Sequence, residues 1–287
     1  MRGDAATMSV SRPVSAAQAV AACGRQNESL ILAGGTDLMV LWNRGALNGR
    51  AVVDISGVRE WRKITLLREG LSVGSLATHS AILQHAGVLE SFPLLARACA
   101  TIGAAQIQNR GTLGGSLANA SPAADTFPPL AVYEPLIHVV STRGRRIVAF
   151  SELFLGVKRT SLRPGELIAA VELHEPGRKP NRQYFRKVGT RAAQSISKVV
   201  AAGLLWLNKD KTAAEVRFAL GSVAPTVRRL KTVEEFLTKK RLTRDTIGAA
   251  CALVHRDISP IDDVRSTAHY RLTVAKNLLR QFLEGRP

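Results

Sequence analysis

Two glycine-rich segments carry the residue types that could bind an anion. The first reads ILAGGTDL at 31–38, where an apolar run meets Gly34 and Gly35 and then a hydroxyl and a carboxylate. Because glycine has no Cβ, two in succession let the backbone turn sharply and present its N–H groups to a phosphate. An isolated pair of this kind is also typical of a tight β-turn. The segment has neither the GxGxxG pattern of a Rossmann fold nor the GKS or GKT of a Walker loop.

The second segment reads NRGTLGGSLAN at 109–119 and is followed by Asp125. Glycines and small hydroxyl residues suit a second anion-binding turn, and the Asp125 carboxylate could accept hydrogen bonds from sugar hydroxyls. A dinucleotide pyrophosphate held between two separate loops requires both of them. Two such segments in one chain therefore predict a dinucleotide site far more strongly than either does alone.

Strands and helices of the N-terminal half must position these loops. Apolar runs predict strands at 30–33, 51–55, 71–75, 136–140 and 145–150. Helices are predicted at 15–23, at 78–86 with Thr78 as the cap, at 93–101 with Pro93 in the first turn, and at 122–133. Segment 102–120 has no apolar period, and we expect it to be a long polar connection with a functional role.

One further strand, at 166–173, has an informative alternation. Its core face is expected to carry Leu167, Ala169, Val171 and Leu173. Its other face begins with Ile168 and Ala170 before it turns polar, and this face is expected to border a cleft.

The second half begins after HEPGRKPN at 174–181, a charged segment with two prolines and a glycine that predicts a domain boundary. Strands are predicted at 183–187, 197–207 and 214–220. Helices are predicted at 233–239, 244–255 and 267–283. In the last helix Leu272, Ala275, Leu279 and Phe282 recur at helical spacing, so one face should pack on a sheet.

Composition excludes several classes of protein. Of 287 residues, 46% are hydrophobic and 22% are charged, which fits a folded globular chain. The longest apolar run, 199–207, is about half of what a membrane span needs, and the N-terminus lacks a signal-peptide core, so we expect a cytoplasmic protein with no membrane span. Three cysteines without a CxxC pair exclude a disulfide framework and an iron–sulfur cluster of the usual spacing.

The net charge is unusual. Forty Lys and Arg against 22 Asp and Glu leave +18, which raises the question of a nucleic-acid partner. The basic residues are scattered, however, and aromatic residues make up only 5%, whereas nucleic-acid binders concentrate their charge in a patch. A solvated surface or an acidic protein partner explains the charge at least as well.

These motifs resemble one family: the FAD-binding medium subunits of the molybdenum hydroxylases, the group of xanthine dehydrogenase and carbon monoxide dehydrogenase. The resemblance covers nearly the whole chain. It rests on AGGTDL at 33–38, GAAQIQNRGTLGGSLANASPAADTFPPL at 103–130, LRPGEL at 162–167, YFRKVGTRAAQSIS at 184–197, FALGSVAPT at 218–226 and DDVRSTAHYR at 262–271.

The resemblance implies an α+β protein. A vanillyl-alcohol-oxidase or PCMH-type FAD domain at 1–175, made of two α/β subdomains at about 1–55 and 56–175, would precede a smaller α+β domain at 182–287. Its backbone N–H groups and hydroxyls at 33–37 and 112–116 would bind the FAD pyrophosphate. The residues implied to bind FAD are Ile31, Leu32, Ala33, Gly34, Gly35, Thr36, Asp37, Leu38, Ile102, Thr112, Leu113, Gly114, Gly115, Ser116, Asp125, Ile168 and Lys187.

The resemblance also assigns these residues to the two ends of the cofactor. Asp125 would lie at the ribose or adenine end, and Ile102 would replace an aromatic residue near the adenine. Ile168 and Lys187 would lie near the isoalloxazine ring, where a lysine could stabilise negative charge on reduced flavin. The sequence departs from the family in Gln108, which replaces an arginine, and in Ser116, which replaces an asparagine but keeps a hydrogen-bonding side chain.

As a function, the resemblance implies the electron-transfer subunit of a complex. Non-covalent FAD would take electrons from iron–sulfur clusters and pass them to an external acceptor, and no residue of this chain would act on the organic substrate. The molybdenum cofactor and the 2Fe–2S clusters would belong to a large and a small partner subunit, in a heterotrimer that is often dimerised. The alternatives are a nucleic-acid or acidic-protein binding module on a degenerate flavin fold, and a stand-alone flavin reductase.

Overall fold

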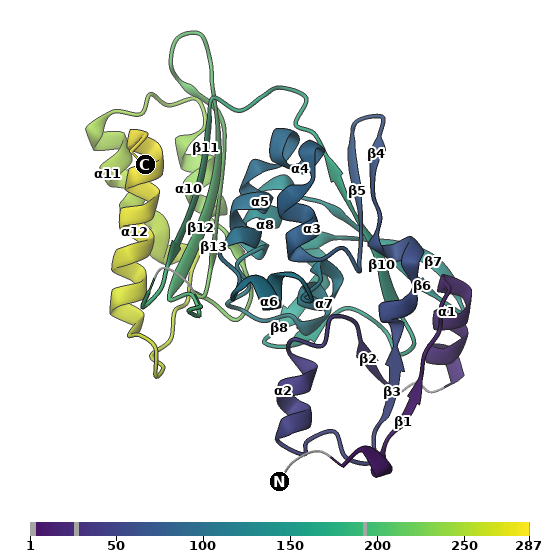
Figure 1. The fold of residues 1–287 in the computed structure, drawn as a ribbon. Coiled ribbons are helices and arrows are strands. Elements are labelled where there is room, and N and C mark those ends of the chain that lie inside the picture. The colour runs from purple at the N-terminus through teal and green to yellow at the C-terminus, as the bar shows by residue number, and fades with distance from the viewer. Residues whose placement is uncertain (1–3, 26–28, 192–193, 287) are drawn as a thin grey trace.

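The computed structural model describes residues 4–25, 29–191 and 194–286, so that residues 192–193 of the motif at 184–197 lie outside the described part. Two parts of the chain lie side by side (Figure 1). The N-terminal part carries a small parallel sheet and a five-stranded antiparallel sheet, and the C-terminal part carries a four-stranded antiparallel sheet. The mixed class expected from the sequence is confirmed.

The parallel sheet is formed by segments near the N-terminus in the order β1-β3-β2. Its strands are β1 (Ser9–Ser11), β3 (Ala51–Asp54) and β2 (Leu30–Leu32). Helix α1 (Ala16–Arg25) buries a face of small residues, Ala19, Ala22 and Cys23, against the core. Helix α2 (Leu38–Asn43) follows β2 and buries none of its residues.

The five-stranded sheet has the order β4-β5-β10-β6-β7. Its strands are β4 (Ile64–Leu67), β5 (Gly70–Gly74), β10 (Leu167–His174), β6 (Leu136–Ser141) and β7 (Gly144–Ala149). The predicted hairpin is confirmed, because β6 and β7 pair directly through the turn at Ser141 and Gly144.

The face assignment predicted for β10 is right only in part: Val171 and Leu173 pack in the core and Ile168 borders a cavity, but the two faces do not alternate as expected. A register shift between Ile168 and Ala170 marks a β-bulge at Ala169, and a bulge interrupts the alternation of side chains. Ile168 therefore packs in the same core as Val171, whereas Leu167 packs in the smaller core that includes α1. Both side chains of the bulged end, Leu167 and Ile168, line the cavity described below.

Helices cover the inner face of this sheet. They are α3 (His79–Gln84), α4 (Ala86–Ser91), α5 (Pro93–Ala100), α6 (Ala105–Gln108), α7 (Leu113–Asn119), α8 (Phe127–Tyr133) and α9 (Phe150–Leu153), and the small pair β8 (Phe154–Gly156) and β9 (Arg159–Thr160) follows. The Thr78 cap is confirmed, since its side chain accepts a hydrogen bond from Ala81 N at 3.1 Å, and Pro93 opens α5. The segment 102–120, expected to be a long polar connection, contains the short helices α6 and α7.

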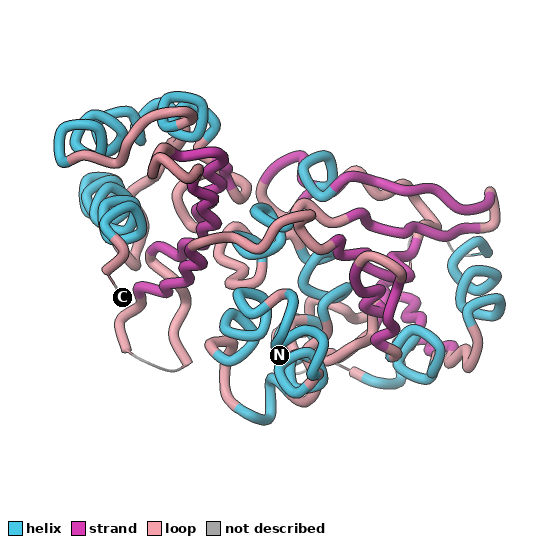
Figure 2. The backbone as a smooth tube through the Cα atoms, turned by 90° about the horizontal axis from the view of Figure 1, so that it is seen from above, coloured by secondary structure: helices cyan, strands magenta, loops and turns pink. Residues whose placement is uncertain are grey.

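The C-terminal part places three helices on one side of its sheet (Figure 2). The strands, in sheet order, are β11 (Arg182–Val188), β12 (Val199–Leu207), β13 (Ala213–Gly221) and β14 (Arg228–Arg229). The helices are α10 (Lys231–Leu237), α11 (Arg244–Leu253) and α12 (Ala268–Glu284). As predicted, α12 turns Ala275, Leu279 and Phe282 into the core. The described residues also include short 3₁₀ helices at Ala5–Thr7, Ile55–Gly57, Arg59–Arg62 and Val254–Arg256.

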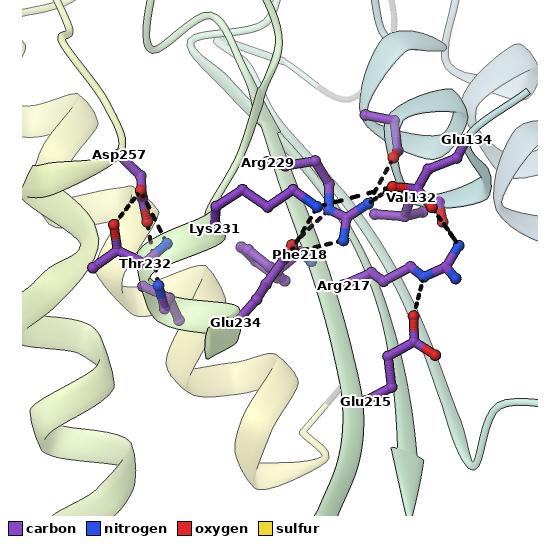
Figure 3. Close-up of polar contacts among 12 residues, drawn as sticks. Val132, Glu134, Glu215, Arg217, Phe218, Arg229, Lys231, Thr232, Glu234 and Asp257 are labelled. Atoms are coloured by element: carbon purple, nitrogen blue, oxygen red, sulfur yellow. Dashed lines mark hydrogen bonds and ion pairs between the residues drawn. The ribbon is translucent and has the colours of Figure 1, made fainter. Parts of the chain in front are cut away.

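The two parts share a core and are also joined by ionic contacts. Buried residues of β12 and β13, including Leu204 and Trp206, pack in the same cluster as the helices of the N-terminal part. At the C-terminal end of α8, the carboxylate of Glu134 forms ion pairs with two arginines (Figure 3). Its Oε2 lies 3.1 Å from Arg217 Nη1, and its Oε1 lies 2.8 Å from Arg229 Nη1. The same guanidinium of Arg229 contacts Glu234 at 2.6 Å, so charged groups of both parts form one network.

Candidate cofactor-binding site

A cavity of about 480 Å³ lies between the two glycine-rich segments. The expected residues that line it are Ile31, Ala33, Gly34, Gly35, Thr36, Asp37, Leu38, Ile102, Thr112, Gly114, Gly115, Ser116 and Ile168. The lining residues that sequence reasoning missed are Leu30, Ile55, Ser75, Leu76, His79, Ile107, Ala118, Asn119, Leu162, Glu166 and Leu167. The structure thus brings together two loops that are far apart in the sequence, as the motifs predict.

The first loop offers free backbone donors. Within the described residues, none accepts a hydrogen bond from the backbone N–H of Gly34, Gly35 or Thr36. Gly35 has φ +79°, a conformation that L side chains rarely adopt. A Cβ on Gly34 would lie 1.8 Å from the carbonyl oxygen of Arg110, so this glycine allows the two loops to touch. The loop is therefore shaped by glycine and has N–H groups to give to an anion.

The second loop differs from expectation, because its backbone donors are already used. Gly114 N donates to Ser75 O at 2.8 Å, Gly115 N to Thr112 Oγ1 at 3.1 Å, and Ser116 N to Thr112 O at 3.0 Å. Leu113 N donates to Ala77 O at 3.1 Å, and its side chain is fully buried in the core. The loop can therefore give a ligand close approach and hydroxyl groups, but the expected cradle of backbone N–H groups is wrong for 113–116.

The two glycines of this loop have different surroundings. A Cβ on Gly114 would lie 2.5 Å from the Cβ of Ser75, so its small size lets α7 pack against the end of β5. A Cβ on Gly115 would meet only the Thr112 hydroxyl, at 2.8 Å, and the Cβ of Ala33, at 4.0 Å. Gly115 therefore faces the first loop across the cavity.

Two polar residues, Ser75 directly after β5 and His79 at the start of α3, line the cavity beside the second loop. The hydroxyl of Ser75 is buried and has no hydrogen-bond partner among the described residues. His79 Nε2 lies 3.5 Å from Ser116 Oγ, and Nδ1 lies 3.7 Å from Cys99 Sγ. Burial lowers the pKa of His79 to about 4, so the imidazole is neutral at pH 7.

The cavity lining also includes apolar side chains and the carboxylate of Glu166. Ile55, Leu162 and Ile168 supply the apolar surface. Glu166 is held by Arg146 through two hydrogen bonds of 2.9 and 2.7 Å, and these lower the pKa of its carboxyl. A carboxylate fixed in this way stays ionised at pH 7 and orders the loop that carries Leu162.

Asp125 and Lys187 are not among the residues that line the cavity. Lys187 Nζ lies 2.6 Å from Asp125 Oδ2 and donates to Thr101 O at 2.9 Å, while Ser197 donates to the other carboxylate oxygen at 2.5 Å. Burial raises the pKa of the Asp125 carboxyl, and the Lys187 ammonium opposes that shift. The pair is therefore anchored at Thr101, the residue before the lining residue Ile102. The expectation that Asp125 and Lys187 lie at opposite ends of the cofactor is wrong.

Leu32 also lies outside the cavity lining, although its neighbours on β2, Leu30 and Ile31, belong to it. Within the described residues, no three His, Cys, Asp or Glu side chains are grouped so that they could hold a metal ion. None of the described helices combines the length and the apolar composition needed to cross a membrane.

Comparisons with known proteins agree with this architecture. Residues 6–175 match the family model of the FAD binding domain in molybdopterin dehydrogenase, and residues 183–285 match that of the CO dehydrogenase flavoprotein C-terminal domain. The chain is 28% identical to the nicotine 6-hydroxylase medium subunit of Paenarthrobacter nicotinovorans, over 94% of this chain and 93% of the relative. It is 30% identical to the glyceraldehyde dehydrogenase medium chain of Sulfolobus acidocaldarius, over 86% of each.

Solved structures show the same fold. A chain of carbon monoxide dehydrogenase from Hydrogenophaga pseudoflava superposes with a TM-score of 0.91 at 25% identity, with 96% of both chains covered. A chain of quinoline 2-oxidoreductase from Pseudomonas putida 86 gives 0.91 at 26% identity, over 99% of this chain and 98% of that one. This protein therefore belongs to the FAD-binding medium subunits of the xanthine dehydrogenase and carbon monoxide dehydrogenase family, the flavoprotein components of oxidoreductases.

The residues present fit FAD. The first loop has unused N–H groups for a pyrophosphate, and the buried hydroxyl of Ser75 lacks the partner that a buried polar group normally has. The apolar surfaces at Ile102, Ile107 and Ile168 suit the two ring systems of the cofactor.

Proposed function

We propose that this chain binds FAD non-covalently in the cavity between the glycine-rich loops and acts as the electron-transfer subunit of a molybdenum hydroxylase complex. The observation that carries the proposal is the turn at 34–36, whose three N–H groups have no partner within the described residues. They would bind the pyrophosphate, with Thr36 and Ser116 supplying hydroxyls. When bound, FAD supplies a centre that accepts electrons singly and releases them in pairs.

The role of the protein residues in this proposal is to bind and orient the cofactor. The side chains of Ile102 and Ile107, and those of Leu167 and Ile168, would cover its rings and exclude water from them. The described residues hold no group of metal ligands, so the electron donor would be a cluster in a partner subunit. We further propose that the chain divides at 175–182, which the limits of the two family matches support.

The proposed partners are a large subunit with the molybdenum cofactor and a small subunit with 2Fe–2S clusters, in a heterotrimer. The support comes from relatives named as medium subunits or medium chains, which cover nearly the full length of this chain. A cytoplasmic location is also proposed. The three cysteines are free and buried, as fits a reducing compartment.

The first test is the absorbance spectrum of the purified protein. A yellow protein with one FAD per chain supports the proposal, and a fully folded, colourless protein that takes up no added FAD contradicts it. Acid precipitation then tests the mode of attachment, because the His79 imidazole lines the cavity. Release of all the flavin into the supernatant is expected, and flavin in the pellet would show a covalent bond.

A further inference from the structure

We propose that Ser75 is a direct ligand of the bound FAD, and that beside the second glycine loop the cofactor is held by the hydroxyls of Ser75 and Ser116 in place of backbone N–H groups. This inference rests on the proposed function and extends it to a residue outside both glycine motifs. It begins from a buried hydroxyl that has no partner within the described residues.

The backbone of Ser75 fixes where its side chain starts. Its N–H donates to Ala169 O at 2.9 Å, and its carbonyl accepts from Gly114 N at 2.8 Å. These bonds tie the residue to the bulge of β10 on one side and to the second loop on the other. Since the backbone N–H is used, the hydroxyl is the one hydrogen-bond donor of Ser75 that remains unused.

Because its backbone donors are already used, the second loop can hold a ligand only with the help of side-chain hydroxyls. The N–H groups of Leu113, Gly114, Gly115 and Ser116 all donate within the protein. A dinucleotide that enters this side of the cavity therefore meets hydroxyls, from Ser116 in the loop and from Ser75 behind it. Each can donate a hydrogen bond to an oxygen of the pyrophosphate or of the adjoining sugar chain.

The neighbours of Ser75 explain why the residue is small. Gly114 packs so closely that a Cβ there would lie 2.5 Å from the Cβ of Ser75. A larger residue at 75 would push α7 away from the end of β5. The site therefore accepts a short side chain, and of the short side chains serine has a strong donor.

The test compares Ser75→Ala with Ser222→Ala in the full-length protein. Ser222 is the matched control, because it also has a buried hydroxyl without a partner in the described residues but lies outside the cavity lining. FAD affinity is measured by quenching of flavin fluorescence, and the melting temperature is measured with and without FAD.

For Ser75→Ala we expect a Kd for FAD about tenfold higher, no loss in the melting temperature of the apoprotein, and a smaller rise in melting temperature on adding FAD. Ser222→Ala should keep the wild-type Kd. Ser75→Cys, which has nearly the same shape and a weaker donor, should fall between wild type and Ser75→Ala, and it serves as the test variant if the alanine variant does not fold.

Two results would contradict the proposed contact between Ser75 and FAD. The first is an unchanged Kd in both Ser75 variants. The second is an equal drop in melting temperature with and without FAD, since a purely structural role predicts that pattern. A wild-type protein that binds no FAD is a different failure, because it removes the proposed function and the Ser75 contact with it.

Discussion

At the residue scale, a glycine is needed at positions 34 and 115 for different reasons. Substitutions at the two positions should therefore have different effects on FAD binding and on stability. Gly115→Val should abolish FAD retention and leave the apoprotein folded, because the new side chain meets only the Thr112 hydroxyl and the space in front of Ala33. Gly34→Val should destabilise the apoprotein as well, because its Cβ would collide with the Arg110 carbonyl oxygen. Flavin content and thermal melts of the apoproteins check both expectations. Normal FAD content in Gly115→Val would contradict this view of the second loop.

His79 gives a prediction about pH. Burial lowers its pKa to about 4, while an unfolded histidine titrates near 6.5. Between these values the unfolded state binds the extra proton, so the free energy of unfolding should fall as pH drops from about 6.5 to about 4, by roughly 2–3 kcal/mol from this residue. His79→Gln should remove most of that slope in urea melts of the apoprotein. The exposed His269→Gln is the control, and an equal slope in all three proteins would refute the assignment.

Single residues also show how far sequence could predict the site. The glycine motifs identify both loops, because two such segments occur in one chain and a dinucleotide held between two loops requires both. Ser75 and His79 carry no such signal, since a serine after a strand and a histidine in a helix are ordinary. Only the fold brings them to the cavity. Lys187 and Asp125 were expected at separate ends of the cofactor, and the spacing of 62 residues gave no sign that they pair.

At the scale of elements, the pair of Lys187 on β11 and Asp125 before α8 joins the two parts of the molecule, and both side chains are buried. Lys187→Met should lower the free energy of unfolding by about 3 kcal/mol, because it leaves a buried carboxyl without its cation. Removal of the ammonium should raise the pKa of Asp125 further, so the loss should be larger at pH 8 than at pH 5. Denaturant unfolding at both pH values measures this.

Two variants control that experiment. Arg286→Met removes an exposed ion pair with Glu284 and should cost less than 1 kcal/mol. Lys187→Met combined with Asp125→Leu replaces both charges with apolar groups and should recover most of the loss. If the double variant is as unstable as Lys187→Met alone, the buried charge is not the cause.

The elements themselves are predictable where the pattern is regular. Strand β12 and helix α12 follow from a continuous apolar run and from apolar residues at helical spacing. Helices α6 and α7 escape prediction, because they are only four and seven residues long and α7 contains two adjacent glycines, which disfavour a helix. The bulge at Ala169 escapes it as well, since one extra residue in the ladder leaves no mark in the sequence.

At the scale of the whole molecule, ion pairs within the chain account for only part of its basic residues, and the net charge is +18. The ion pairs between its two parts engage a few cations, at Glu134 and Asp125, and Arg229 also pairs with Glu234 within the C-terminal part. With 40 basic and 22 acidic residues, many cations have no acidic residue of this chain to pair with. A surface with such an excess of positive charge raises the rate at which acidic protein partners associate with it.

The last prediction concerns assembly. Co-expression with the proposed large and small subunits should give a complex that elutes as one species on size exclusion, whereas the chain alone should adhere to anionic resins and surfaces. Association should slow as salt rises from about 50 to 500 mM, because the Debye length falls below 10 Å over that range. DNA binding is the competing use of the charge. If the assembled complex still retains DNA with a steep salt dependence, the basic side chains bind nucleic acid. If assembly abolishes that retention, the same side chains are covered by the protein partners.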